Sequence, residues 1–235
     1  MPKLSIIIPS RNEEYLDKTI EDIKRNAITD VEILPGDDTD GIGQRAMMNK
    51  LAKQVTGDFI MKTDGHCSFS YGFDDILIKD VDENTILAPI LMPLDPIAWA
   101  INGRKQMSQF VFDRNFVMQH TDGKPGETMC LQGSCWVVST KNYWGWNVCD
   151  ETLGSWGGQA VELGIAAWIN GGVCKTTGSA YYGHLFRHTN EEFPYDRGDN
   201  PGQLATKELQ KRYHSDPRIL KLAEKFNNPL DWNLP

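Results

Sequence analysis

The stretch Phe59-Ile60-Met61-Lys62-Thr63 is an apolar, strand-like run that leads directly into Asp64-Gly65-His66-Cys67. A carboxylate and an imidazole two residues apart, with a glycine between them, can both turn toward one point just beyond a strand end. In an extended backbone they would instead share one face, because positions i and i+2 point the same way. In either arrangement an oxygen and a nitrogen ligand converge, which suits Mn²⁺ or a similar borderline metal better than Ca²⁺. Taken alone, Asp-x-His is equally compatible with a simple turn.

A strand–helix–strand unit precedes this stretch. Residues 4–8 form an apolar run, and the polar Ser10-Arg11-Asn12-Glu13 then opens a segment with apolar residues at helical spacing. A second strand, Val31 to Leu34, ends at Pro35-Gly36-Asp37-Asp38. Ligands of open parallel sheets collect at the carboxyl ends of the strands. We therefore expect Asp38 to lie at the same sheet edge as Asp64.

Strand and helix patterns continue to alternate along the chain. Apolar periodicity predicts helices at 44–55, 74–81, 159–168, 203–213 and 217–226, and strands at 85–91, 130–139 and 173–182. The segment 95–128 carries aromatic residues without a clean period. We interpret it as a small hydrophobic cluster, with a cover over one side of a cleft as the alternative. One α/β domain accounts for this order of elements.

Composition narrows the functional classes. The chain has 235 residues and a net charge of −8, which argues against broad, nonspecific binding of nucleic acid. Its five cysteines include no zinc-like CxxC pair, so we expect reduced thiols. No signal peptide precedes the first strand, and no apolar run approaches the roughly 20 residues of a membrane span. These features predict a soluble, cytoplasmic protein.

Two groups of motifs, taken together, resemble those of known glycosyltransferases. Ile7-Ile8-Pro9-Ser10-Arg11-Asn12-Glu13, Gly36-Asp37-Asp38 and Asp64-Gly65-His66 resemble the nucleotide-binding half of GT-A glycosyltransferases. Trp156-Gly157-Gly158-Gln159-Ala160-Val161-Glu162 and Gly183-His184-Leu185-Phe186-Arg187 resemble the catalytic domain of polypeptide N-acetylgalactosaminyltransferases. The motifs occur in the same order as in that family.

The resemblance implies a GT-A fold, a Rossmann-like mixed α/β sheet flanked by helices in a single domain over 1–235. Its nucleotide-binding half would cover about 1–93 and its acceptor and catalytic half, with a lid at 188–202, about 94–202. Two C-terminal helices would occupy 203–235.

The resemblance also implies roles for individual residues. Asp64, His66 and His184 would bind Mn²⁺ (or Mg²⁺), and oxygens of the donor diphosphate would complete the ligand shell. Positions on the UDP-sugar side are Pro9, Arg11, Glu13, Asp37, Asp38, Arg45 and Arg187. Among these, Asp38 or Asp37 would contact uracil and Arg187 the diphosphate, whereas Arg45 is either an exposed salt-bridge former or an anion contact. Positions on the catalytic side are Trp156, Gln159 and Glu162, with Trp156 lining the leaving-group side.

Two departures from the family matter. The family has Glu after Trp-Gly-Gly, where this chain has Gln159, which cannot ionise. Glu162 matches the second acidic position of that motif or only anchors its helix. The chain also lacks the lectin domain and membrane anchor of the animal enzymes, so we expect a compact microbial or phage relative.

These observations predict a metal-dependent enzyme that transfers a sugar from a UDP-sugar to a hydroxyl acceptor, with retention of the anomeric configuration. One alternative is a metal-dependent hydrolase or nucleotidyltransferase that uses the same carboxylate and histidines. Another is a nucleotide-sugar-binding protein without turnover, which the neutral Gln159 would favour. The acceptor stays open among a peptide, a glycan, a small metabolite and a modified nucleobase in phage DNA.

Overall fold

The computed structural model describes residues 3–102, 106–187, 189–195 and 202–227. Its strands are β1 (Leu4–Ser10), β2 (Val31–Asp37), β3 (Phe59–Thr63), β4 (Cys67–Phe69), β5 (Thr85–Asp95), β6 (Ala100–Ile101), β7 (Gln109–Phe112), β8 (Met118–Thr121), β9 (Glu127–Thr128), β10 (Cys135–Ser139) and β11 (Val173–His184). Its α-helices are α1 (Leu16–Asn26), α2 (Gln44–Ala52), α3 (Phe73–Asp80), α4 (Thr140–Gly145), α5 (Gln159–Ile169), α6 (Gln203–Tyr213) and α7 (Pro217–Lys225). Two short 3-10 helices lie at Glu151–Leu153 and Asn190–Glu192.

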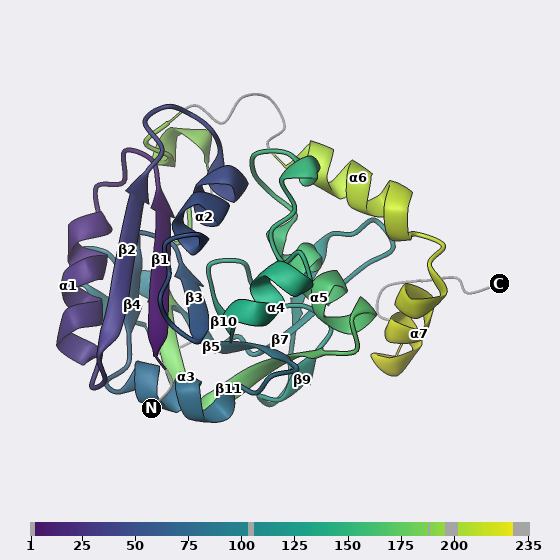
Figure 1. Ribbon diagram of the computed structural model, residues 1–235, viewed down its shortest axis with the longest axis horizontal. Coiled ribbons are helices and arrows are strands. Elements are labelled where there is room, and N and C mark those ends of the chain that lie inside the picture. The colour runs from purple at the N-terminus through teal and green to yellow at the C-terminus, as the bar shows by residue number, and fades with distance from the viewer. Residues whose placement is uncertain (1–2, 103–105, 188, 196–201, 228–235) are drawn as a thin grey trace.

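One mixed sheet organises the molecule (Figure 1). Its strand order is β2-β1-β3-β10-β5-β11-β4, with β6 added to β5 and β9 to β11. Strands β7 and β8 form a separate two-stranded sheet. A mixed sheet flanked by helices was expected for the α/β class, and the structure confirms it.

The strand directions bring distant parts of the sequence to one sheet edge. β1 runs parallel to both β2 and β3. β10 is antiparallel to β3 and to β5, and β11 is parallel to β5. It follows that β1, β2, β3 and β11 all point the same way. The ends of β3 at Thr63 and of β11 at His184 therefore lie on the same edge.

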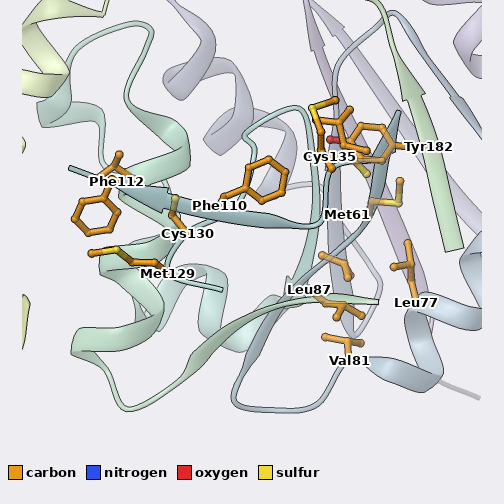
Figure 2. Close-up of a cluster of buried hydrophobic side chains, with 14 of the residues drawn as sticks. Met61, Leu77, Val81, Leu87, Phe110, Phe112, Met129, Cys130, Cys135 and Tyr182 are labelled. Carbon is orange, nitrogen blue, oxygen red and sulfur yellow. The ribbon is translucent and has the colours of Figure 1, made fainter. Parts of the chain in front are cut away.

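Two buried clusters cover the two faces of the sheet, as the alternation of side chains along a strand requires. Leu4, Ile6 and Ile8 of β1 belong to the first cluster, which also receives side chains from α1 and α3. Ile7 belongs to the second cluster, together with side chains of α2 and α4. Figure 2 shows part of the first cluster, where Met61 of β3 and Tyr182 of β11 lie close to Cys135.

The predicted elements match the observed ones with informative exceptions. β3 and α6 begin and end at the predicted residues. The strand predicted at 130–139 begins only at Cys135, because the Ser134 backbone N–H turns to the side chain of Gln132. Strands β6 to β9 lie in the loosely patterned segment 95–128. Its buried phenylalanines belong to the first cluster, so the segment is hydrophobic as expected but extends the main core and does not form a small cluster of its own.

All five cysteines are free and buried, as expected for reduced thiols. In the described part of the chain, none of the helices combines the length and apolar character that crossing a bilayer requires. Residues 188 and 196–201 of the predicted lid lie outside the described residues, so the lid stays a prediction.

Candidate active site

A cleft of about 390 Å³ opens at the sheet edge where β1, β3 and β11 end. Nine of the residues predicted for the site line it, namely Pro9, Arg11, Glu13, Asp38, Asp64, His66, Trp156, His184 and Arg187. Four predicted residues do not line it, namely Asp37, Arg45, Gln159 and Glu162.

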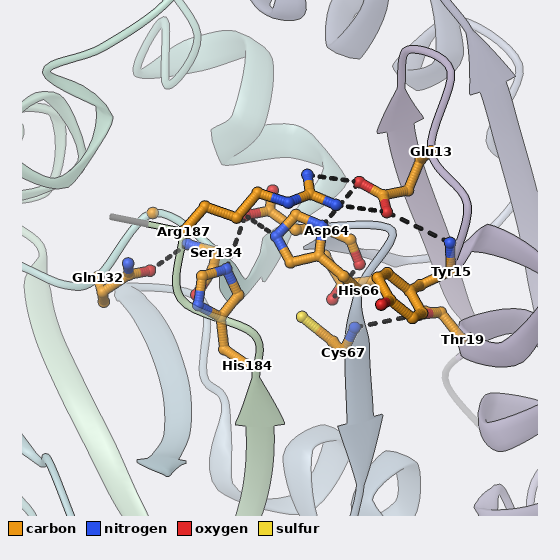
Figure 3. Close-up of polar contacts among 12 residues, drawn as sticks. Glu13, Tyr15, Thr19, Asp64, His66, Cys67, Gln132, Ser134, His184 and Arg187 are labelled. Carbon is orange, nitrogen blue, oxygen red and sulfur yellow. Dashed lines mark hydrogen bonds and ion pairs between the residues drawn. The ribbon is translucent and has the colours of Figure 1, made fainter. Parts of the chain in front are cut away.

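Three ligand side chains converge in this cleft (Figure 3). One ligand atom from each of Asp64, His66 and His184 lies within 4.8 Å of the other two. Nε2 of His184 is 3.3 Å from Oδ2 of Asp64, and Nε2 of His66 is 4.0 Å from the same oxygen. The pairing of β4 with β11 explains the convergence, because it places Cys67, next to His66, opposite His184.

Glu13 holds His66 in one orientation. Its Oε2 accepts a hydrogen bond of 2.9 Å from Nδ1 of His66, which leaves Nε2 facing Asp64 with a free lone pair. Metal-binding histidines are commonly fixed by a carboxylate in this way. Arg187 donates to both oxygens of Glu13 at 2.8 Å. Burial would raise the pKa of Glu13, but the bonds from His66 and Arg187 lower it to about 2.

His184 is a buried imidazole at the end of β11. Burial lowers its pKa to about 4, against the raising effect of the bond to Asp64, so the ring is neutral at physiological pH. The neutral ring is the form that binds metals. Within the described residues, no hydrogen-bond partner is found for its Nδ1. Two imidazole nitrogens and one carboxylate oxygen fit Mn²⁺ or another borderline divalent cation.

Asp64 is paired with a buried cation on its other side. The ammonium of Lys62 contacts Oδ1 of Asp64 and donates to the carbonyl of Gly133 at 2.8 Å. Burial opposes ionisation of Asp64, but the charge of Lys62 and the bond from His184 lower its pKa well below the usual range. Asp64 is therefore an ionised carboxylate that presents one oxygen to Lys62 and the other to the histidines.

The loop after β2 forms the opposite wall. The carboxylate of Asp38 is buried and accepts the backbone N–H groups of Ile42 and Gly43 at 2.7 and 2.9 Å. The guanidinium of Arg11 lies over the ring of Tyr195, 5.3 Å from its centroid. Asp37 lies outside the cleft, where its carboxylate accepts the backbone N–H of Asn12. The geometry therefore favours Asp38 over Asp37 as the residue that faces a ligand.

Arg45 was expected to be either an exposed salt-bridge former or an anion contact, and both expectations were wrong. It is 1% exposed and binds Glu162 at 2.8 Å, as well as the carbonyl groups of Gly154 and Gly157. Burial raises the pKa of Glu162 to about 7, although Arg45 acts to lower it. Glu162 thus anchors α5 to α2 through a buried ion pair, the second of the two roles considered for it.

Residues 157–159 were expected on the catalytic side of the site, but they pack against neighbouring segments instead. Gln159 is buried, and its amide nitrogen lies 3.2 Å from Sδ of Met48, away from the cleft. Gly157 and Gly158 have φ values of +87° and +68°. A Cβ on Gly157 would lie 2.2 Å from Cα of Gly202. The paired glycines therefore allow close contact with the chain at the start of α6.

Several cleft residues were missed from the sequence. Gln132, Phe193 and Tyr195 also line the cleft, and Lys62 lies beneath it. Lys62 could have been found from the sequence, because it is a charged residue within an otherwise apolar strand. A lysine that is buried in such a strand needs a partner of opposite charge. Phe193 and Tyr195 lie in the segment predicted as a lid, but its polar composition did not single out these two aromatic side chains.

Comparison with known proteins gives a consistent result, although no protein-family model matches the chain. The chain is 26% identical to the putative polypeptide N-acetylgalactosaminyltransferase 13 of Drosophila melanogaster, over 66% of this chain and 30% of that protein. It is 24% identical to human polypeptide N-acetylgalactosaminyltransferase 10, over 75% of this chain and 31% of that protein. The chain thus spans about a third of the length of these relatives.

Two solved structures share the fold. GalNAc-T7, crystallised with UDP, GalNAc and Mn²⁺, matches 97% of this chain and 55% of its own, with a TM-score of 0.74 and 13% identity. Staphylococcus aureus TarS 1–349, in complex with UDP-GlcNAc, matches 80% of this chain and 59% of its own, with a TM-score of 0.55 and 15% identity. The chain therefore resembles the polypeptide N-acetylgalactosaminyltransferases and has the GT-A glycosyltransferase fold.

Proposed function

We propose that the protein is a metal-dependent glycosyltransferase that transfers a sugar from a UDP-sugar to a hydroxyl acceptor, with retention. The resemblance to N-acetylgalactosaminyltransferases supports the reaction class. One observation carries the proposal for this chain. Asp64, His66 and His184 meet at the carboxyl edge of the parallel strands, in the cleft that Asp38 and Arg187 also line.

The ligand side chains have defined tasks in this proposal. Asp64, His66 and His184 hold the metal, and Glu13 keeps the lone pair of His66 Nε2 directed toward it. A bound Mn²⁺ supplies positive charge that stabilises the negative charge developing on the diphosphate leaving group. Arg187 donates one N–H of each terminal nitrogen to Glu13. Among the described residues, this leaves three N–H groups that can donate to anionic oxygens.

The rest of the cleft binds the donor. In this assignment Asp38, in the loop after β2, contacts the uracil base, and Pro9 and Arg11, which line the same cleft, lie on the donor side. Trp156 lines the leaving-group side, where its indole excludes water from the reacting sugar. The names of the curated relatives make UDP-N-acetylgalactosamine the first donor to test and peptides with Ser or Thr the first acceptors. A glycan, a small metabolite and a modified nucleobase follow.

Of the two alternatives, the binding protein without turnover loses its support, whereas the hydrolase or nucleotidyltransferase is still to be tested. A nucleotide-sugar-binding protein without turnover was motivated by Gln159 in place of Glu. Because Gln159 is buried against Met48 outside the cleft, its neutral amide does not argue against turnover. A metal-dependent hydrolase or nucleotidyltransferase would use the same three ligands, and the products of the reaction separate it from a glycosyltransferase.

The test measures UDP release and acceptor mass in one reaction. The protein is incubated with Mn²⁺, each UDP-sugar and pooled acceptors, and we expect UDP release together with a glycosylated acceptor. Asp64→Asn should lower the rate by about 10²-fold or more, the equivalent of roughly 2.7 kcal/mol. Asp75→Asn is the matched control, because Asp75 pairs with Lys79 on α3.

Three outcomes would contradict parts of the proposal. Sugar released to water without any acceptor product would indicate a hydrolase. Binding of a UDP-sugar with no UDP release from any donor and acceptor would indicate a binding protein. A product whose anomeric configuration is opposite to that of the donor, by NMR, would refute retention.

A further inference from the structure

Lys62 is an unusual neighbour for a metal ligand. It lies in β3, in the middle of the sheet, and its side chain is 1% exposed. Its ammonium contacts Oδ1 of Asp64, and its second acceptor is the carbonyl of Gly133. A cation held against a ligand carboxylate repels an incoming metal ion, so this pairing works against metal binding.

With Lys62 included, positive and negative side chains around the proposed ligands are equal in number. Among the described residues, three carboxylates line the cleft and three cations lie in or directly beneath it, namely Glu13, Asp38, Asp64, Arg11, Lys62 and Arg187. Two of the carboxylates are engaged by cations, Glu13 by Arg187 and Asp64 by Lys62. The charges of these six side chains cancel, so a divalent cation that enters alone finds ligand atoms but no net negative charge from them.

We propose that Lys62 makes metal binding depend on the nucleotide, by cancelling the charge of Asp64 until a diphosphate supplies negative charge of its own. This inference rests on the proposed function, because it takes UDP or a UDP-sugar as that diphosphate. Coupling between two ligands is reciprocal, so the metal strengthens nucleotide binding by the factor by which the nucleotide strengthens metal binding. Lys62 is thus a positioning residue that acts through Asp64.

A purely structural role does not require a charge at this position. The end of β3 is already held by the backbone bond of 2.9 Å from Asp64 to the carbonyl of Ser134. The buried neighbours of Lys62 on its face of the sheet are apolar, namely Ile60 in β3 and the cross-strand partners Ile7 and Trp136. Burying an ammonium costs desolvation energy that a well-packed apolar side chain would avoid. The charge therefore needs an explanation beyond packing, and its effect on the Asp64 carboxylate provides one.

The experiment measures Mn²⁺ affinity by electron paramagnetic resonance, with and without saturating UDP, and needs no turnover. The key variant is Lys62→Gln, which removes the charge and keeps an amide that can donate to Asp64 and Gly133. Lys62→Met is a second uncharged variant. Lys79→Gln is the matched control, because it removes the same charge from a surface pair with Asp75. Circular dichroism establishes that each variant is folded.

We expect UDP to tighten Mn²⁺ binding to the wild-type protein at least tenfold. Lys62→Gln should tighten nucleotide-free Mn²⁺ binding at least tenfold, equivalent to 1.4 kcal/mol. The ratio between the Mn²⁺ affinities with and without UDP should therefore be smaller in this variant than in the wild type. Lys62→Met should change the affinity in the same direction, and Lys79→Gln should leave it unchanged.

The inference is overturned by wild-type protein that binds Mn²⁺ equally tightly with and without UDP. It is also overturned by folded Lys62 variants whose nucleotide-free affinity is unchanged or weaker. Wild-type protein that binds no Mn²⁺ even with UDP would contradict the proposed function itself. The wild-type measurement therefore separates a failure of the function from a failure of the role of Lys62.

Discussion

Glu13 illustrates how one side chain can serve both stability and the site. It accepts hydrogen bonds from His66 and from both terminal nitrogens of Arg187, and its side chain is 5% exposed. These bonds lower its pKa to about 2, below its ordinary value of 4.5. A carboxyl group with a lowered pKa stabilises the folded protein above its ordinary pKa. That contribution is lost as the pH falls toward the lowered value.

The first prediction concerns Glu13→Gln. At pH 7 the variant should lose about 3 kcal/mol of unfolding free energy, the equivalent of the difference between the two pKa values. Between about pH 4.5 and pH 2 its stability should fall less steeply than that of the wild type, because the titrating group is gone. Urea denaturation across this range measures both effects. Glu14→Gln, at the exposed neighbouring position, is the control. If Glu13→Gln and the wild type lost stability equally with falling pH, the pKa of Glu13 would not be lowered in the folded protein.

A second prediction concerns His184→Ala. The substitution removes one of three ligands, so Mn²⁺ binding in the presence of UDP should weaken strongly and metal-dependent turnover should fall by about 10²-fold or more. The folded state should persist, because the ring lies at the cleft and not in the sheet interior. Electron paramagnetic resonance measures the affinity. His120→Ala, which changes a histidine that does not line the cleft, is the control, and unchanged Mn²⁺ affinity in His184→Ala would exclude His184 as a ligand.

At the scale of elements, the contact between α5 and α6 depends on two glycines. Gly157 has φ of +87° and lies against Gly202, while a Cβ on Gly158 would contact Ala205 and Leu209 of α6. Side chains other than glycine are strained at such φ values. The two glycines of the Trp-Gly-Gly sequence therefore let the first turns of α6 pack closely against this segment, next to Gly202, which lines the cleft.

The third prediction follows from this contact. Gly157→Ala should destabilise the protein by at least about 2 kcal/mol, since the backbone conformation is strained and the new Cβ meets the Gly202 backbone. Gly145→Ala is the matched control, because nothing lies within 4 Å of a Cβ at that position near the end of α4. Thermal and urea denaturation compare the two. Equal stabilities of the two variants would show that the contact is more adaptable than its geometry implies.

The fourth prediction concerns the first residue of α5. Gln159→Glu should retain measurable turnover, because the side chain does not line the cleft. Its unfolding free energy should fall by about 1–3 kcal/mol, because burying a carboxylate costs desolvation energy and Sδ of Met48, which accepts from the amide, has no proton to donate to it. The position at a helix N-terminus offsets part of this cost. Complete loss of turnover in a folded variant would mean that the neutral amide acts in the reaction after all.

At the scale of the whole molecule, the sequence predicted the strands that form the site better than the connections between them. Alternation and apolar runs identify β1, β3 and β11, because each is a buried strand with a strong local signal. Of the proposed metal ligands, Asp64 and His66 follow from the Asp-x-His motif after β3, whereas His184 at the end of β11 follows from the resemblance to the family. The burial of Arg45 with Glu162 could not be predicted, since it depends on how α2 and α5 meet across more than a hundred residues.

The fifth prediction concerns the stability of the whole fold. The cleft is built from the ends of β1, β3 and β11, which are distant in sequence, so a ligand bound there must stabilise the folded chain as a unit. A ligand at 100 times its Kd adds about 2.7 kcal/mol to the unfolding free energy. For a domain of this size, that corresponds to a rise of about 5–10 °C in Tm.

Because the proposed site couples metal binding to diphosphate binding, we expect this rise only when UDP and Mn²⁺ are present together, with much smaller shifts for either alone. Differential scanning fluorimetry with UDP, Mn²⁺, both, and both plus EDTA measures it. Asp64→Asn should lose most of the combined shift, whereas Asp75→Asn, which changes a carboxylate on α3 that does not line the cleft, should keep it. An equal shift with UDP in the presence of EDTA would mean that nucleotide binds this cleft without a metal, and the three converging ligands would then need another explanation.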